Sequence, residues 1–440
     1  MALVLTRGSI EIYLIPMTTL RPELLMPAGS LDKLRVALSY GADAVYAGVP
    51  FFSLRARENE FNEEALQTGI SEARAMGKKL YLTANIFARN LKLKSFQENL
   101  SRWAALKPDA LIMSDPGLIM MARESFPEIP IHLSVQANCM NWQAVKFWQK
   151  LGVTRIILSR ELRLEEVKEI RQRVPDIELE AFVHGSVCIA YSGRCLMSHY
   201  MSYRDANQGV CDNSCRYSFK VFSNQPGSEG QQPDFYLKDM RHPDSEALYR
   251  IDEDEHGTHL MNAKDLCLVE HLKELHEAGI CSFKVEGRTK SIYYAAMISR
   301  IYKQAIDDMM AGKKFDPSLK MELQKLSNRD YFTGFMVGTQ TSDSINYDPG
   351  VRGHQSLFVG ITTEASSADG TVGFEAKGQM SIGEEIEVIT PERSYFAKIK
   401  NLIKPNGEVC DKVHPGFGLC RVQLSEKVPS MAMLSRRQDA

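Results

Sequence analysis

The stretch ELLMPAGSLDKLRVALSYGADAVY, residues 23–46, decides the fold, because it reads in turn as a strand, a helix and a strand. Ser30 is a good N-cap for a helix over Leu31–Tyr40, and Gly41 is a typical helix end. The alternation continues along the chain and predicts eight strands: Glu23–Met26, Ala44–Ala47, Leu80–Asn85, Ala110–Ser114, Ile131–Gln136, Arg155–Leu158, Glu178–Val183 and Ser282–Val285. Strands that alternate with helices pair in parallel, and eight of them predict an α/β fold, a closed (β/α)8 TIM-like barrel. An open doubly wound sheet is the alternative, but no GxGxxG follows the first strand, which disfavours dinucleotide binding.

The regular alternation breaks after the seventh strand, where residues 188–280 form an insertion that bears five of the nine cysteines. An insertion at this point lies on the C-terminal face of a barrel, where barrel enzymes keep their active sites. After residue 340, short apolar runs punctuated by Gly and Pro predict a small β-barrel or β-sandwich. Its predicted strands are Leu357–Thr362, Gly370–Glu375, Glu385–Ile389, Tyr395–Ile399 and Leu419–Leu424. The predicted domains are an N-terminal extension over 1–19, the barrel with its insertion over 20–340, and the β domain over 341–440.

Composition excludes several classes of protein. The chain has 440 residues, 44% of them hydrophobic, and a net charge of −2, which exclude a disordered protein and a globally basic nucleic-acid coat. No apolar run is long enough for a transmembrane helix. The odd number of cysteines argues against a disulfide framework, and no signal-peptide pattern opens the chain. We therefore expect a cytoplasmic protein, in which clustered thiols are ligands or catalysts.

Four cysteines form a pattern of their own. Cys188, Cys195, Cys211 and Cys215 are spaced as C-x6-C-x15-C-x3-C, directly after the seventh strand. Thiolates bind zinc or iron–sulfur clusters, and structural zinc favours two tight pairs. Only the second pair here is tight, so the spacing favours a cluster, with zinc and unligated cysteines as the alternatives.

Residues 180–198, EAFVHGSVCIAYSGRCLMS, resemble position by position the signature of the collagenase-like peptidase family of bacteria. The segments LMPAG at 25–29, GADAVY at 41–46 and FKVEGR at 283–288 resemble the same family. The resemblance extends from about residue 23 to residue 425, and it is strongest to the branch of the family that modifies tRNA.

This resemblance implies a function. It implies a 4Fe-4S cluster on Cys188, Cys195, Cys211 and Cys215, with prephenate as a co-substrate or required metabolite. It also implies hydroxylation of the wobble uridine at carbon 5, hence the anticodon loop of tRNA as partner and a possible redox partner. In some ubiquinone-branch relatives the fourth ligand lies further along the chain, so Cys267 is the rival of Cys215. The alternatives are a peptidase of the same family, and an oxygen-independent hydroxylase of ribosomal RNA or a ubiquinone precursor.

Polar side chains at the C-terminal ends of the strands are the other candidates. His184, Glu286 and Arg288 are predicted as catalytic residues; His184 is placed to act as an acid or base, and Arg288 to bind a carboxylate. The predicted substrate-binding residues are Asn85, Gln136, Asn138, Arg160 and Arg55, and Asp115 and Glu161 lie at similar positions. Each of these side chains has a structural alternative, in which it only ties loops together.

Basic residues interleaved with aromatic ones lie in residues 194–220 and 393–404, a pattern that suits RNA but is common on protein surfaces. Two rival functions have weaker support. A peptidase would need a nucleophile, but there is no Gly-x-Ser-x-Gly, and Ile280 interrupts the HExxH frame that begins at His276, so only a cysteine with His184 as base remains. A zinc-stabilised, non-catalytic RNA-binding protein is the other rival.

Overall fold

The computed structural model describes residues 20–54, 59–188, 190–216, 219–223, 235–240, 249–251, 264–337 and 356–437. Eight parallel strands close into the predicted barrel, because the last of them pairs in parallel with both the first and the seventh. In barrel order the strands are β1 (Glu23–Ala28), β2 (Ala44–Gly48), β3 (Lys79–Ala84), β4 (Ala110–Met113), β5 (Ile131–Leu133), β6 (Arg155–Ile157), β7 (Glu178–Ser186) and β12 (Ser282–Val285). The predicted TIM-like fold is confirmed.

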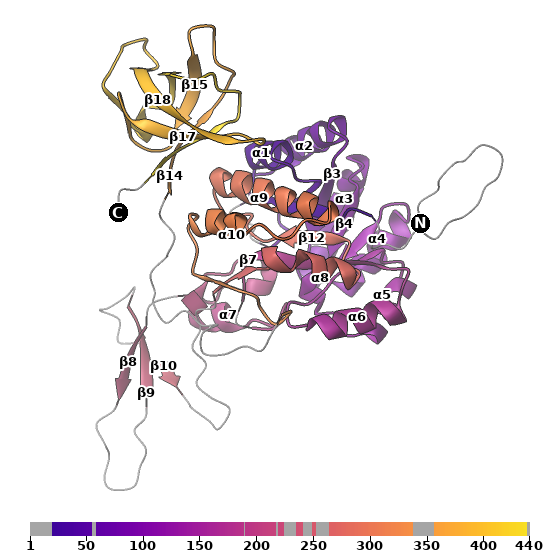
Figure 1. Ribbon diagram of the computed structural model, residues 1–440. Helices are drawn as coiled ribbons and strands as arrows, with labels where there is room; N and C mark the ends of the chain where they lie inside the picture. The colour runs from indigo at the N-terminus through magenta and orange to yellow at the C-terminus, as the bar shows by residue number, and fades with distance from the viewer. Residues whose placement is uncertain are drawn as a thin grey trace, which may run out of the picture.

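Helices surround this barrel (Figure 1). They are α1 (Leu31–Ser39), α2 (Glu63–Ala75), α3 (Asn90–Ala105), α4 (Pro116–Ser125), α5 (Trp142–Lys150), α6 (Leu164–Arg173), α8 (Leu272–Glu277) and α9 (Ile292–Met310), with α10 (Pro317–Gln324) packed on α9. Local sequence explains where they begin. The Ser30 side chain accepts a hydrogen bond from the backbone N–H of Lys33, and Asp115 caps α4 in the same way with Pro116 in its first turn.

The segment between β7 and β12 carries additional elements. It contains α7 (Met197–Ser202) and a three-stranded antiparallel sheet of β8 (Phe219–Ser223), β9 (Phe235–Asp239) and β10 (Tyr249–Ile251). Strand β11 (Asp265–Cys267) then pairs antiparallel with the end of β7, and β13 (Tyr331–Phe332) pairs with β11. Helix α8 follows these added elements in the chain and leads into β12, so it takes the place of the usual helix between two barrel strands.

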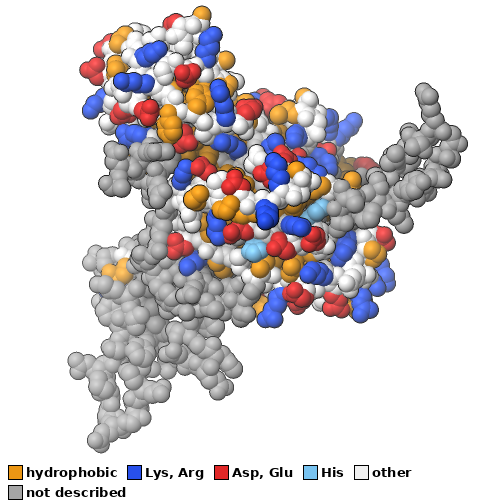
Figure 2. All heavy atoms as spheres, viewed as in Figure 1, with side chains coloured by type: hydrophobic (Ala, Val, Ile, Leu, Met, Phe, Trp, Pro, Cys, Tyr) orange, Lys and Arg blue, Asp and Glu red, His pale blue; other side chains and the backbone are white. Residues whose placement is uncertain are grey.

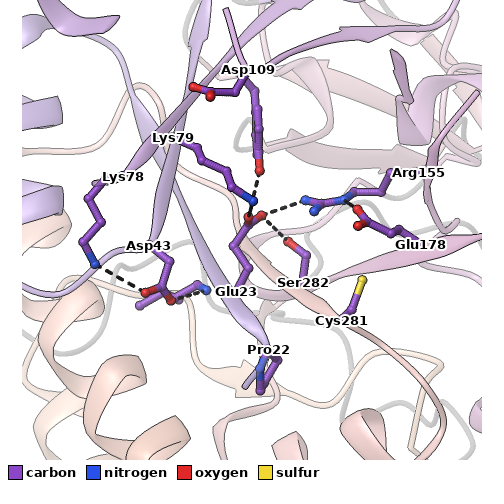
Figure 3. Close-up of polar contacts among 12 residues, drawn as sticks. Pro22, Glu23, Asp43, Lys78, Lys79, Asp109, Arg155, Glu178, Cys281 and Ser282 are labelled. Carbon is purple, nitrogen blue, oxygen red and sulfur yellow. Dashed lines mark hydrogen bonds and ion pairs between the residues drawn. The ribbon is translucent and has the colours of Figure 1, made fainter. Parts of the chain in front are cut away.

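Buried charges cross-link the N-terminal end of the barrel (Figure 3). Glu23 opens β1, and its carboxylate accepts hydrogen bonds from Arg155 Nη1 at 2.7 Å, from Ser282 Oγ and from the Tyr81 hydroxyl. Arg155 also pairs with Glu178 and Glu180 at the start of β7. This network serves stability rather than chemistry, because catalytic groups of barrels lie at the opposite end.

The C-terminal part is a closed six-stranded barrel rather than a sandwich. Its strands, in barrel order, are β14 (Ser356–Thr362), β15 (Thr371–Ala376), β20 (Leu419–Leu424), β18 (Ser394–Ile403), β17 (Glu385–Ile389) and β21 (Met433–Arg437). A separate two-stranded ladder joins β16 (Met380–Ser381) and β19 (Lys412–Val413). The buried Tyr40 hydroxyl of α1 donates to the carbonyls of Ile389 and Met431, and Tyr293 of α9 stacks on Phe358. These contacts attach the small barrel to α1 and α9 of the large one.

Among the described residues, the structure contains no helix with the length and apolar character needed to cross a bilayer. Lysine and arginine are interspersed with aspartate and glutamate over the helical face in Figure 2. This mixture agrees with the net charge of −2 and places no extended basic patch on that face.

Candidate functional site

A cavity of about 140 Å³ opens at the C-terminal ends of the barrel strands. Its walls come from the barrel strands, from the loops that follow them and from the cysteine-bearing segment after β7. All four cysteines of the predicted ligand set line it: Cys188, Cys195, Cys211 and Cys215. We call it the cysteine cavity. The structure therefore brings together, at the face where barrel enzymes react, four thiols that are spread over 28 residues of sequence.

The first half of the cysteine segment is held against the β5 and β6 loops. Glu161 accepts hydrogen bonds from the backbone N–H of Ser192, at 2.9 Å, and from its hydroxyl. Gly193 has φ +72°, and a Cβ atom there would lie 2.1 Å from the carbonyl oxygen of Gln136. Only glycine permits this close approach, so Gly193 fixes the turn between Cys188 and Cys195.

The second half of the segment docks on the loop before α3. The Phe87 N–H donates to the carbonyl of Asn207, and the Gln208 amide donates back to the carbonyl of Phe87. The Asn207 side chain also donates to the carbonyl of Cys195, at 3.3 Å, which ties the two halves together. These contacts hold the segment around Cys195 against the barrel loops.

The thiols lie within electrostatic range of one another. Burial raises the pKa of Cys195, and the neighbouring Cys188 and Cys211 raise it further. Burial also raises the pKa of Cys215, against the opposing charge of Arg216, and the other three thiols add to the increase. Thiols that repel each other's charge in this way are suited to a cationic ligand, which binds the thiolate form. In the described ranges no three His, Cys, Asp or Glu side chains are spaced for a single metal ion.

The cavity floor is cationic and aromatic. Lys284 of β12 is buried, and its Nζ donates to Glu180 Oε1 at 2.8 Å. The same Nζ lies 4.2 Å from the ring centroid of Tyr46 and 5.7 Å from that of Phe182. Burial lowers the pKa of Lys284, and Glu180 opposes that shift. These floor residues were not predicted from the sequence. The signal for Lys284 was a lysine inside the apolar run of β12.

Two of the other cations that line the cavity, Arg160 and Arg288, were predicted as site residues. Arg160 stacks on Phe182 at 3.9 Å and pairs with Glu286 at 3.6 Å. Arg288 is buried, donates to the carbonyl of Leu54 at 2.6 Å and lies 5.9 Å from the Tyr46 ring. Arg160, Glu286 and Arg288 therefore do meet in one place, as their positions at strand ends suggested.

The predicted amide side chains are largely engaged by loops. Asn85 lines the cavity, but its carbonyl oxygen accepts from the Leu54 N–H and its amide donates to Ser134 Oγ. Gln136 also lines the cavity, within a short 3-10 helix over Val135–Ala137. Asn138 has a left-handed backbone, and its side-chain oxygen accepts from the Ser159 hydroxyl.

Two other predicted positions have different outcomes. Asp115 is the N-cap of α4, and its second carboxylate oxygen accepts from the Ala88 N–H. The prediction for Arg55 lies outside the described residues.

His184 and Cys267 lie behind the cavity wall rather than on it. Cys267 of β11 pairs with His184 of β7. The buried His184 ring lies among Tyr294, Tyr302 and Tyr331, and its Nδ1 is 3.2 Å from the Tyr302 hydroxyl. Burial lowers the pKa of His184 to about 3 and raises that of Cys267 to about 11. Neither residue is among those lining the cysteine cavity, whereas Cys215 is.

Comparison with known families identifies the chain. A model described as peptidase family U32 matches residues 29–346, and a model of the U32 C-terminal domain matches residues 354–435. The chain belongs to peptidase family U32. This confirms the resemblance read from the motifs, and it accounts for both barrels of the structure.

Relatives of this chain carry different names. The tRNA hydroxylation protein P of Escherichia coli K12 is 46% identical over 423 residues, which are 90% of this chain and 92% of that protein. The protein of the same name from Helicobacter pylori J99 is 38% identical over 436 residues, 94% of this chain and 98% of the relative. A protein of Porphyromonas gingivalis W83 named collagenase is 27% identical over 422 residues, which are 92% of this chain and 95% of that protein.

Proposed function

We propose that this chain is a tRNA-modifying enzyme that hydroxylates the wobble uridine at carbon 5 inside the cysteine cavity. The observation that carries the proposal is that cavity, in which four thiols and four cations surround a space at the catalytic end of a barrel. The relatives named as tRNA hydroxylation proteins support the same reaction class.

We further propose that Cys188, Cys195, Cys211 and Cys215 hold a 4Fe-4S cluster. Four thiolates are the ordinary ligand set of such a cluster, and a cluster several ångströms across accepts thiolates set further apart than one ion does. Bound there, it would supply electrons or Lewis acidity beside the substrate. The position of Cys215 on the cavity wall, and of Cys267 behind it, favours Cys215 as the fourth ligand.

Prephenate is the proposed small organic acid, as co-substrate or required metabolite. Lys284, Arg160 and Arg288 present positive charge to the cavity, and guanidinium groups suit carboxylates. Glu286 neutralises Arg160 in part, at 3.6 Å, and Glu180 neutralises Lys284, at 2.8 Å. Arg288 is the proposed carboxylate partner, because a guanidinium group can donate two parallel hydrogen bonds to one carboxylate. A redox partner would be needed to reset the cluster between turnovers.

A wobble base reaches such a cavity by leaving its stack in the anticodon loop, which costs little for a loop nucleotide. Exposed aromatic rings around the cysteine segment offer platforms for unstacked bases: Tyr203 is 89% exposed and Tyr191, which also lines the cavity, is 57% exposed. Base–aromatic stacking contributes about 1–3 kcal/mol per base. The proposed substrate places the activity in the cytoplasm.

Two outcomes separate hydroxylation from peptidase activity. Bulk tRNA from a bacterial strain lacking its own uridine hydroxylases would be analysed by mass spectrometry after expression of this chain. The proposal expects 5-hydroxyuridine or its derivatives to appear. The peptidase alternative expects no change in the tRNA and cleavage of a collagen-like peptide instead. Of the described residues lining the cavity none is a histidine, so a cysteine nucleophile there has no imidazole base beside it.

The cluster is tested separately. Protein purified without oxygen should be brown and contain about four irons and four sulfides per chain, the content of one such cluster. Cys195→Ala should lose that content, while Cys139→Ala, a buried thiol away from the cavity lining, should keep it. A colourless zinc-containing wild type would reject the cluster and favour the zinc-stabilised RNA-binding alternative.

A further inference from the structure

A second cavity, of about 250 Å³, adjoins the cysteine cavity. The two share four lining residues, which are Ser186, Asn213, Arg216 and Glu286. The second one continues past the end of β12 to the loop before β13, where Lys290 and Arg329 line it. Nothing in the proposed hydroxylation uses this space.

The charges of the second cavity do not balance. Arg216, Lys290 and Arg329 face two carboxylates, Asp265 and Glu286. Arg329 occupies Asp265 with its guanidinium and its backbone N–H, and Glu286 pairs with Arg160 of the cysteine cavity. Both carboxylates therefore already have a cation of their own.

Neither of these carboxylates lies within ion-pair distance of Lys290 in the described structure. Its ammonium makes no hydrogen bond or ion pair with another residue in the part of the chain that the structure describes, and lies 5.6 Å from the Tyr294 ring centroid. Burial lowers the pKa of Lys290; Asp265 opposes this, while Arg329 and Arg216 add repulsion. A partly buried ammonium repelled by two guanidinium groups gains stability from an anion placed among them.

Polar neighbours define which anion fits. Thr289 and Ser327 supply hydroxyl groups to the same walls. Lysine, arginine and hydroxyl groups together are the usual partners of nucleic-acid phosphates. A nucleotide whose base turns into an enzyme pocket rotates about its backbone, so its flanking phosphates stay at the mouth of that pocket.

We propose that the second cavity binds a phosphate of the tRNA backbone next to the nucleotide whose base enters the cysteine cavity. Lys290 is its main cation, and Arg216, on the shared wall, faces both the phosphate and the base. This inference rests on the proposed function and deepens it, because it assigns a place to the RNA backbone.

Binding of bulk tRNA to the full-length protein, measured between 50 and 200 mM salt, tests the assignment. Lys290→Gln should weaken binding about three- to tenfold at 100 mM salt and lower the slope of log affinity against log salt by about one. Lys290→Arg should keep both values near wild type. The matched control is Lys273→Gln, an exposed lysine on α8 paired with Glu277, which should change neither.

Circular dichroism first checks that each variant is folded, and Lys290→Met, which keeps the apolar stem, replaces the glutamine variant if needed. Wild-type affinity and slope in the charge-free variant would overturn the inference. A second result would also overturn it. If inorganic phosphate stabilises wild type but not Lys290→Gln, while both proteins bind tRNA with equal affinity, the cavity takes a free anion and not a phosphate of tRNA. If wild type hydroxylates tRNA in either case, the proposed function survives; if wild type neither binds nor hydroxylates tRNA, both fall.

Discussion

Glu180→Gln is expected to destabilise the large barrel strongly. The Glu180 side chain is fully buried and pairs with Lys284 Nζ at 2.8 Å and with Arg155 Nη1 at 3.1 Å. Both cations are themselves buried, at 3% and 4% exposure. Removing the carboxylate charge leaves Arg155 with Glu23 and Glu178, but leaves Lys284 without a carboxylate within ion-pair distance among the described residues.

The size of the effect follows from that unpaired charge. Removing one partner of a buried pair costs about 3–5 kcal/mol, which corresponds to a fall of roughly 5–15 °C in the unfolding midpoint. The pKa of Lys284, already lowered by burial, should fall further without its carboxylate. A lysine with a depressed folded-state pKa binds its proton less tightly than in the unfolded chain, so the variant should regain stability as pH rises toward 10.5.

Thermal and urea unfolding of wild type and variants measure this. Glu178→Gln is the matched control, because Glu178 contacts Arg155 at 2.7 Å from the same strand but is 44% exposed, and it should cost at most about 1 kcal/mol. The double variant Glu180→Gln, Lys284→Met removes both charges and should recover most of the loss. A single variant as stable as the control, or a double variant that is the sum of its parts, would refute the reasoning.

Three further predictions follow from the site. Gly193→Ala should reduce iron content and tRNA hydroxylation, because its Cβ would lie 2.1 Å from the Gln136 carbonyl oxygen. The control Gly77→Ala, at φ +67° in open space, should cost only about 1 kcal/mol of stability. Equal activity in both variants would argue against a role for the Gly193 turn. Burial lowers the folded-state pKa of His184 to about 3, so the unfolded chain binds more protons than the folded one below pH 6.5. The free energy of unfolding should therefore decrease as the pH is lowered through this range, by up to about 1.4 kcal/mol per pH unit. His184→Gln should flatten this part of the plot of unfolding free energy against pH, and an unchanged plot would contradict a buried neutral ring. Tyr203→Ala should weaken tRNA binding about tenfold without lowering iron content, and unchanged binding would remove this ring as a stacking platform.

Sequence periodicity predicts the large barrel well because its strands are local apolar runs between capped helices. The strand predicted over Ile131–Gln136 is too long, since Ser134 Oγ accepts from the Gln136 N–H and turns the chain into a 3-10 helix. The last strand of the small barrel, Met433–Arg437, was not predicted. It closes that barrel by pairing with both β14 and β17, and such non-local pairing leaves little signal in a short segment that ends in Ser435 and two arginines.

The candidate site was predictable in part. Positions after strand ends correctly gathered the four cysteines with Arg160, Glu286 and Arg288, because parallel strands of a barrel end at one face. Position alone does not say which way a side chain points. His184 is the residue before the left-handed Gly185, and its ring turns outward to the tyrosines of α9 and β13 instead of inward. Lys284 was not predicted because a lysine in a strand is expected to be exposed. Here it is buried because it pairs with the buried carboxylate of Glu180.

The most direct test compares Cys215→Ala with Cys267→Ala in a strain lacking its own tRNA uridine hydroxylases. Both cysteines lie in the segment between β7 and β12, but of the two only Cys215 lines the cysteine cavity. Mass spectrometry of bulk tRNA should find 5-hydroxyuridine derivatives restored by wild type and by Cys267→Ala, and absent with Cys215→Ala. Full restoration by Cys215→Ala, with loss in Cys267→Ala, would contradict the assignment of the reaction to this cavity.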